Sequence, residues 1–214
     1  MRIGISRVHF PVTTLGPGRR IGLWLQGCSI HCPGCIARDT WPSAENEQLV
    51  EVDEVLSWFE RHSGDAEGIT ISGGEPLDQG PAVQKFLEAI RGSELFSNCD
   101  VLLYTGYSYE TAISKCPRIF HLVDAVMSEP FVISEPTDLI WRGSENQILH
   151  ATSELGRQRF GPLQDARRDG EALQFSSDGG RAWTIGIPNR RTLPALKRKM
   201  KADGVELQEC SWQT

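Results

Sequence analysis

The sequence lacks a long apolar run, a low-complexity stretch and a second cluster of cysteines. A helix that crosses a membrane needs about 20 consecutive apolar residues, and no segment approaches this length. Residues 1–10 also lack the apolar core of a signal peptide. We therefore expect a cytoplasmic protein that uses no membrane.

Basic residues are in the minority, with 22 Lys and Arg against 28 Asp and Glu and a net charge of -6. Proteins that bind nucleic acid concentrate basic side chains on one surface, so nucleic acid is not an expected partner. One local basic group stands out: Arg190, Arg191, Lys197, Arg198, Lys199 and Lys201. We interpret it as a solvated helix face, with docking of an acidic partner or an anionic substrate as the alternative.

With 214 residues, the chain can form one sizeable core or one domain with a small appendage. Four short apolar runs predict buried strands: 21–26, 69–71, 101–104 and 122–127. Helical spacing of apolar residues in 52–59 and 83–90 predicts helices between them. The alternation predicts an α/β fold, a partial (β/α) barrel of mostly parallel strands covered by helices, whose active site lies at the carboxyl ends of the strands.

The sequence from residue 151 onward differs in composition from the part before it. Residues 156–170 are polar and rich in arginine and glycine, which favours a loop. Further on, residues 173–187 predict a hairpin, 193–202 a helix and 205–207 a last strand. We therefore divide the chain into a core, 1–150, and a small C-terminal α+β extension, 151–214, of unknown role.

The chemically informative cysteines are Cys28, Cys32 and Cys35, which directly follow the first predicted strand. Three thiolates leave one iron of a four-iron cluster without a protein ligand, and this spacing favours such a cluster. Zinc is the alternative, with His31 as a possible fourth ligand. The scattered remaining cysteines are interpreted as free thiols: Cys99, Cys116 and Cys210.

A second motif, Gly73-Gly74-Glu75-Pro76, directly follows the next predicted strand. Two residues without side chains let a ligand approach the backbone closely, and proline stiffens the exit of the turn. Because the carboxyl ends of parallel strands share one edge of a sheet, we expect this motif and the cysteines to form one site.

The two motifs together resemble the radical S-adenosylmethionine superfamily. Five further segments resemble the activating proteins of anaerobic ribonucleotide reductase: 16–19 (GPGR), 26–28 (QGC), 40–41 (TW), 104–107 (YTGY) and 140–147 (IWRGSENQ). The resemblance covers residues 1–150.

The resemblance implies a defined chemistry. The three cysteines would hold a [4Fe-4S] cluster, and the open iron would chelate S-adenosylmethionine. An electron from a donor such as flavodoxin or ferredoxin would cleave this cofactor to methionine and a 5′-deoxyadenosyl radical. The radical would take a hydrogen atom from a glycine of a partner, a glycyl-radical enzyme such as anaerobic ribonucleotide reductase. The protein itself would position the reacting groups and exclude water and oxygen.

The resemblance also assigns roles around the double glycine. Gly73 and Gly74 would present backbone groups to the methionine amine of S-adenosylmethionine, while Glu75 and Pro76 would shape the turn.

Four residues further along the chain complete the predicted cofactor site. Tyr104 and Thr105 would line the adenosine pocket. Arg142 would bind the methionine carboxylate or the partner's backbone, or be a surface arginine in a turn. Asn146 would contact the cofactor, or act as a cap or loop residue.

Two other functions stay open at this level. The chain could be a radical S-adenosylmethionine enzyme that modifies a small molecule or a peptide, because it continues to residue 214 where the activating proteins end near residue 150. A zinc-binding adaptor is the alternative outside the enzymes.

Overall fold

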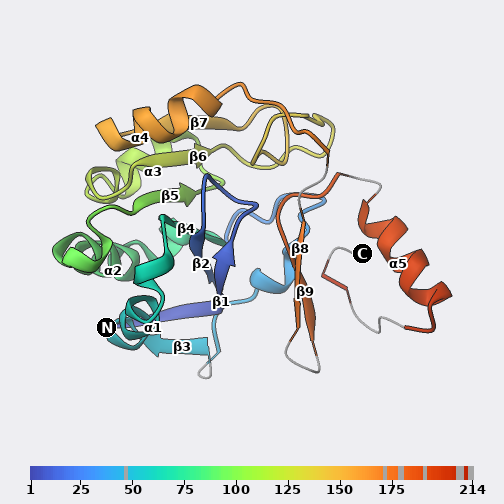
Figure 1. Ribbon diagram of the computed structural model, residues 1–214, viewed down its shortest axis with the longest axis horizontal. Helices are drawn as coiled ribbons and strands as arrows, with labels where there is room; N and C mark the ends of the chain where they lie inside the picture. The colour runs from blue at the N-terminus through green and yellow to red at the C-terminus, as the bar shows by residue number, and fades with distance from the viewer. Residues whose placement is uncertain (46–47, 171–172, 178–180, 190–191, 206–209, 212–214) are drawn as a thin grey trace.

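The computed structural model describes residues 1–45, 48–170, 173–177, 181–189, 192–205 and 210–211. Its centre is a seven-stranded sheet with the strand order β3-β1-β2-β4-β5-β6-β7 (Figure 1). The strands are β1 (Arg2–Val12), β2 (Arg20–Leu25), β3 (Leu49–Glu51), β4 (Gly68–Gly73), β5 (Asp100–Tyr104), β6 (Ala125–Ser128) and β7 (Ile148–Ala151).

The middle of the sheet is parallel. β2, β4, β5 and β6 pair in parallel, while β1, β3 and β7 join at the sides as antiparallel strands. The predicted α/β class with a parallel centre is confirmed. The four central strands all end at the same edge of the sheet, so the loops after them meet there.

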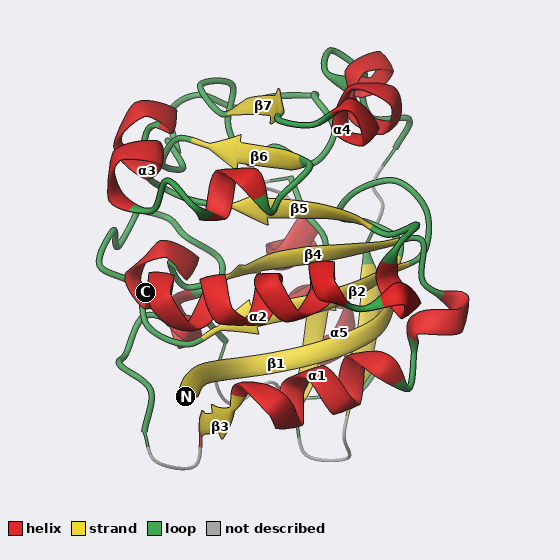
Figure 2. Ribbon diagram, turned by 90° about the vertical axis from the view of Figure 1, so that its left-hand side faces the viewer, coloured by secondary structure: helices red, strands yellow, loops and turns green. Residues whose placement is uncertain are grey.

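Helices cover one face of this sheet (Figure 2). They are α1 (Val52–Glu60), α2 (Gly80–Gly92) and α3 (Tyr109–Lys115). Val55 and Phe59 of α1 and Phe86 of α2 are buried against Ile71 of β4 and Leu103 of β5 in the largest apolar cluster. Packing of these amphipathic helices against the sheet is the main source of their stability.

The opposite face of the sheet packs against a helix and a hairpin of the C-terminal part of the chain. α4 (Glu154–Phe160) buries Phe160 against Leu102 and Met127. The expectation of a loop at 156–170 is therefore wrong for residues 156–160, which are helical. Burial of the single large apolar side chain Phe160 stabilises this helix, although the segment is otherwise polar. A hairpin of β8 (Gln174–Ser177) and β9 (Ala182–Ile185) follows, and then α5 (Thr192–Ala202).

These last elements agree with the predicted hairpin and helix. The strand expected at 205–207 lies outside the described residues apart from Val205, which has no strand conformation. The division of the chain at residue 150 stays a prediction. Among the described residues, no helix has the length and apolar character that crossing a membrane would require.

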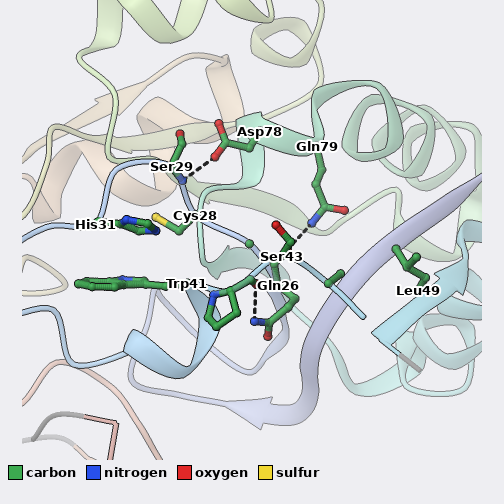
Figure 3. A pocket seen from close by; sticks show the side chains of 12 residues that line it. Gln26, Cys28, Ser29, His31, Trp41, Ser43, Leu49, Asp78 and Gln79 are labelled. Atoms are coloured by element: carbon green, nitrogen blue, oxygen red, sulfur yellow. Dashed lines mark hydrogen bonds between the residues drawn. The ribbon is translucent and has the colours of Figure 1, made fainter. Parts of the chain in front are cut away.

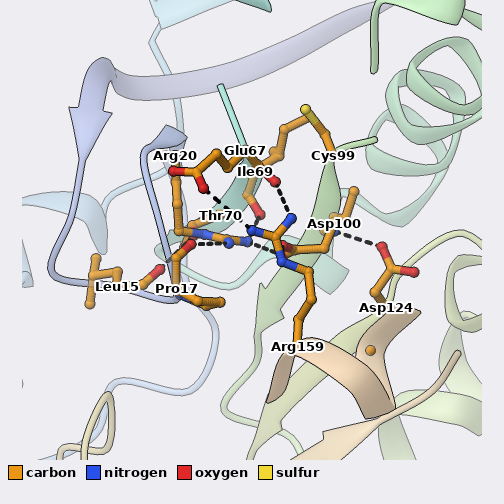
Figure 4. Close-up of polar contacts among 12 residues, drawn as sticks. Leu15, Pro17, Arg20, Glu67, Ile69, Thr70, Cys99, Asp100, Asp124 and Arg159 are labelled. Carbon is orange, nitrogen blue, oxygen red and sulfur yellow. Dashed lines mark hydrogen bonds and ion pairs between the residues drawn. The ribbon is translucent and has the colours of Figure 1, made fainter. Parts of the chain in front are cut away.

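A buried ion pair fixes the amino-terminal side of the parallel strands (Figure 4). Arg20 and Asp100 have fully buried side chains and are joined at 2.5 Å. The Arg20 guanidinium also donates to Thr70 Oγ1 at 2.6 Å and to the Ile69 carbonyl at 2.7 Å. Arg159 Nε of α4 lies 3.1 Å from the second Asp100 oxygen, as an ion pair without hydrogen-bond geometry. The network ties β2, β4, β5 and α4 together at the end of the sheet away from the cysteine loop.

Candidate active site

The three cysteines occupy one loop at the carboxyl end of β2. The start of this loop is fixed by backbone bonds to the segment that follows it, from Gly27 N to the Thr40 carbonyl at 2.8 Å and from Cys28 N to the Trp41 carbonyl at 3.2 Å. A bond from Cys35 N to the Cys32 carbonyl, 3.1 Å, closes the turn between the last two cysteines. All three side chains are half-buried and form no disulfide.

The surroundings of the thiols suit ligation of a cluster. Burial raises the pKa of Cys28, Cys32 and Cys35, and the charges of neighbouring cysteines raise the pKa of Cys32 and Cys35 further. Backbone N–H groups oppose this rise, as at Ala37, whose N lies 3.4 Å from Cys35 Sγ. A bound metal centre removes the thiol proton, and N–H donors then tune the thiolate.

A structural zinc site requires a different arrangement of its ligands. Within the described ranges, no three His, Cys, Asp or Glu side chains are placed so that they could hold one metal ion. A structural zinc site needs its ligands around a single ion, whereas thiolates of an iron–sulfur cluster bind separate irons.

An aromatic stack lies beside Cys35. Against the larger opposing effect of burial, the Trp41 indole, which lies near the Cys35 thiol, lowers the pKa of that thiol. The ring of His31 stacks on Trp41 with centroids 4.6 Å apart, and the Arg38 guanidinium carbon lies 4.9 Å from the centre of the indole. His31 is exposed and has a positive φ of 52°, so it contacts the ring from the solvent side.

The double glycine lies against the backbone of the cysteine loop. Gly73 pairs with Leu25, Gly74 N donates to the Leu25 carbonyl at 2.8 Å, and Glu75 N donates to the Gly27 carbonyl at 2.8 Å. A Cβ on Gly74 would lie 2.0 Å from Gly27 O, and Gly73 has a φ of +113°. The predicted closeness of the two motifs is confirmed, and one reason for both glycines is this approach of two backbones.

Glu75 connects the ends of two parallel strands. Its Oε1 accepts hydrogen bonds from Leu77 N and Thr105 Oγ1, both at 2.9 Å, and its Oε2 accepts one from Gly106 N at 2.7 Å. Burial raises the pKa of this carboxyl to about 7. Both oxygens are thus engaged inside the protein, and Pro76 beside it is buried. Contact of either residue with a cofactor stays a prediction.

Tyr104 and Thr105 lie next to this carboxylate at the end of β5. The Tyr104 hydroxyl donates to the Trp141 carbonyl at 3.0 Å, and burial raises its pKa. Thr105 is buried and donates to Glu75. Both side chains therefore connect β5 to neighbouring segments, and their place in an adenosine pocket stays a prediction.

Arg142 and Asn146 lie in the loop before β7 and leave polar atoms without partners. Arg142 is 8% exposed, donates from Nη2 to the Gln164 carbonyl at 2.7 Å and has a buried Nε with no partner. Asn146 donates to the Pro130 carbonyl at 2.8 Å, while its buried Oδ1 has no partner. The interpretation of Arg142 as a surface residue is wrong, because the fold buries it.

Two side chains that hold the start of the cysteine loop, Asp78 and Tyr107, were not among the predicted site residues. Asp78 accepts from Ser29 N at 2.8 Å and from the Tyr107 hydroxyl at 2.8 Å, and this hydroxyl lies 3.0 Å from Ser29 Oγ. Tyr107 belongs to the YTGY segment, and its place in that segment was the one signal that could have identified it.

An open pocket of about 760 Å³ reaches the cysteine loop (Figure 3). Cys28, His31 and Trp41 line one side of it, and Asp78 and Gln79 line another. A small molecule can therefore reach Cys28, one of the three predicted cluster ligands, without any rearrangement of the loop.

Comparison with known proteins identifies the class. A sequence model of the 4Fe-4S single cluster domain family matches residues 14–150. The fold and the cysteine loop thus define an iron–sulfur protein of the radical S-adenosylmethionine class, and the zinc-binding alternative is rejected.

The relatives give the particular family. The anaerobic ribonucleoside-triphosphate reductase-activating protein of Escherichia coli strain K12 is 30% identical over 149 residues, which cover 66% of this chain and 95% of that protein. The protein of the same name from Enterobacteria phage T4 is 31% identical over 142 residues, 65% of this chain and 88% of that one. A shorter match, 37% over 86 residues, joins 37% of this chain to 33% of the pyruvate formate-lyase-activating enzyme of Staphylococcus aureus. The chain belongs to the family of radical S-adenosylmethionine activating proteins.

Proposed function

We propose that this protein cleaves S-adenosylmethionine reductively and takes a hydrogen atom from a glycine of a partner, a glycyl-radical enzyme such as anaerobic ribonucleotide reductase. The observation that carries the proposal is the direct contact between the cysteine loop and the double-glycine turn, through Gly74 N on Leu25 O and Glu75 N on Gly27 O. This contact supports a single site, because Gly27, whose carbonyl accepts the bond from Glu75 N, directly precedes the proposed cluster ligand Cys28.

Cys28, Cys32 and Cys35 would hold a [4Fe-4S] cluster, which would supply the electron for cleavage of S-adenosylmethionine to methionine and a 5′-deoxyadenosyl radical. The contribution of the protein is to hold the sulfonium and the adenosine in one orientation. Asp78 and Tyr107 fix the start of the loop through Ser29, and Ala37 N donates to Cys35 Sγ at 3.4 Å. These hydrogen bonds favour a rigid cysteine loop, which the proposed orientation of the cofactor requires.

Arg142 is suited to the methionine carboxylate. Its guanidinium is buried, and no carboxylate of the described chain forms an ion pair with it. A buried charge without a counter-ion is costly, and an anionic ligand offsets that cost. The unpartnered Oδ1 of Asn146 can accept a hydrogen bond from a hydroxyl or amino group of the same ligand. We propose that both residues bind S-adenosylmethionine.

The electron comes from an external one-electron donor, for which flavodoxin or ferredoxin is our proposal. The reaction then balances: one electron and S-adenosylmethionine give methionine and the radical, and the radical gains hydrogen from glycine to form 5′-deoxyadenosine.

Electron paramagnetic resonance tests the proposal. The reduced protein, S-adenosylmethionine and a candidate anaerobic reductase are mixed without oxygen, and a glycyl-radical doublet is expected to grow with 5′-deoxyadenosine. A mixture without S-adenosylmethionine is the control. If 5′-deoxyadenosine forms and no tested reductase acquires the doublet, the activating function is wrong and modification of a small molecule or a peptide replaces it.

A further inference from the structure

The C-terminal extension is fastened to the side of the sheet opposite α1, α2 and α3. Gln174 of β8 accepts from Thr13 N at 2.7 Å and donates to the Pro11 carbonyl at 2.9 Å. Ile185 of β9 is 2% exposed and packs in one cluster with Val12 and Leu15. β8 and β9 accordingly lie beside β1 and β2 (Figure 1). The family match ends at residue 150, so these contacts come from a part of the chain that the match does not include.

The extension also reaches the residues proposed to bind the cofactor. Trp183 and Ile187 pack in the same cluster as Trp24 and Tyr104. Tyr104 in turn donates to the carbonyl of Trp141, directly before Arg142. Tyr104 thus packs against the cluster that includes Ile185 of β9 and bonds to the segment that carries Arg142.

Arg168 makes the most direct connection. Its Nε donates to the Leu139 carbonyl at 3.1 Å, its Nη1 to the Ile187 carbonyl at 2.9 Å, and its Nη2 to the carbonyl of Arg142 itself. The backbone adds to this junction, because Ile140 N donates to the Ala166 carbonyl at 2.9 Å. A planar guanidinium with its donors in a fixed fork can fix three carbonyls relative to one another.

Buried polar atoms without hydrogen-bond partners occur in both the core and the extension. The unpartnered atoms of the described chain include Arg142 Nε, Asn146 Oδ1 and, from the hairpin, Trp183 Nε1. A buried donor without an acceptor costs about 1–3 kcal/mol. Trp183, in the extension, thus also has a buried donor that a polar ligand can satisfy.

We infer that the C-terminal extension is a working part of the S-adenosylmethionine site, in which Arg168 is a positioning residue that holds the Leu139–Arg142 segment so that Arg142 meets the cofactor's carboxylate. The inference rests on the proposed function and assigns the extension to the cofactor rather than to partner choice. Arg168 does not touch the ligand and acts through Arg142.

The test compares two adjacent arginines. Arg168→Gln removes the cation that joins the three carbonyls. Arg167→Gln is the matched control, because the Arg167 side chain is 72% exposed and has only a distant ion pair, at 3.8 Å, with Asp138. Affinity for S-adenosylmethionine is measured on the full-length protein with its cluster. Amide hydrogen exchange of residues 139–142 is measured on the full-length protein without the cluster.

We expect Arg168→Gln to weaken S-adenosylmethionine binding about tenfold, the change that one lost hydrogen bond to a charged group produces. The KM for S-adenosylmethionine should rise while kcat stays close to its original value, and amides 139–142 should exchange faster. Arg167→Gln should change none of these. Arg168→Lys, which keeps the cation, should recover part of the affinity.

A double-mutant cycle tests whether the effect passes through Arg142. In an Arg142→Gln background, Arg168→Gln should weaken binding by much less than tenfold, because coupled residues are not additive. Equal affinity in Arg168→Gln and Arg167→Gln, or an undiminished effect in the Arg142→Gln background, overturns the inference. A wild-type protein that fails to bind S-adenosylmethionine overturns the proposed function instead, so the two failures are distinct.

Discussion

Gly74 provides the sharpest test of the contact between the double-glycine turn and the cysteine loop. In Gly74→Ala, the new Cβ would lie 2.0 Å from Gly27 O and 2.9 Å from Thr40 O. Both are backbone atoms, so no side chain can rotate out of the way. The backbone of the cysteine loop would have to move back, and with it Cys28, which follows Gly27.

The size of the effect follows from this overlap. A retreat of about 1 Å or more is needed before the atoms reach ordinary contact, and overpacking of this kind costs about 1–3 kcal/mol. The same movement lengthens the bond from Glu75 N to Gly27 O, now 2.8 Å, which contributes about 1 kcal/mol. For a protein of this size, the melting temperature should fall by about 4 to 15 °C.

Two measurements check the prediction: thermal unfolding of the apoprotein, and iron per chain after anaerobic reconstitution. Both should fall in Gly74→Ala. Gly92→Ala is the control, because a Cβ there meets nothing within 4 Å. If Gly74→Ala melts and binds iron like Gly92→Ala, the close approach of the two backbones is not what the glycine serves.

Two further predictions concern charges inside the core. Burial raises the pKa of Glu75 from 4.5 to about 7. Between these pH values, the folded protein holds a proton that the unfolded chain has lost. The free energy of unfolding should therefore fall as pH rises from about 5 to 7. In Glu75→Gln this fall should be smaller by up to about 3 kcal/mol in urea titrations, and identical slopes would contradict the burial of a titrating carboxyl. Asp100→Asn leaves the Arg20 cation buried without its fully buried partner and should cost about 3 kcal/mol or more, against less than about 1 kcal/mol for Asp53→Asn, whose exposed carboxylate lies 3.7 Å from Lys85. Equal losses in these two variants would refute the role of the buried pair.

The parts of the fold with strong patterns were predictable from the sequence. The apolar runs at β2, β4 and β5 and the helical spacing of α1 and α2 carry their structure locally. The side strands were not predicted. β1 mixes polar and apolar residues and has irregular register with β2, and β3 is three residues long. Their partners in the sheet stabilise them, which a local pattern does not express.

The site was predictable where chemistry and spacing coincide. Cys28, Cys32 and Cys35 and the double glycine could be proposed from the sequence because their spacing is typical of a cluster-binding loop and a tight turn. Arg168 was not found, because an arginine in a polar stretch of sequence is usually solvated. Its role depends on three carbonyls from two other segments, and only the folded chain brings these together.

The most direct test of the account compares two cysteine variants after anaerobic reconstitution and reduction. Cys32 lies in the cluster loop, whereas Cys116 is a half-buried free thiol at the end of α3. Iron, sulfide and the release of 5′-deoxyadenosine from S-adenosylmethionine are measured in the wild-type protein, in Cys32→Ala and in Cys116→Ala. We predict that the wild-type protein and Cys116→Ala carry the cluster and release 5′-deoxyadenosine, while Cys32→Ala does neither. Release that persists in Cys32→Ala, or that is absent from a wild-type protein loaded with iron and sulfide, would contradict the central claim.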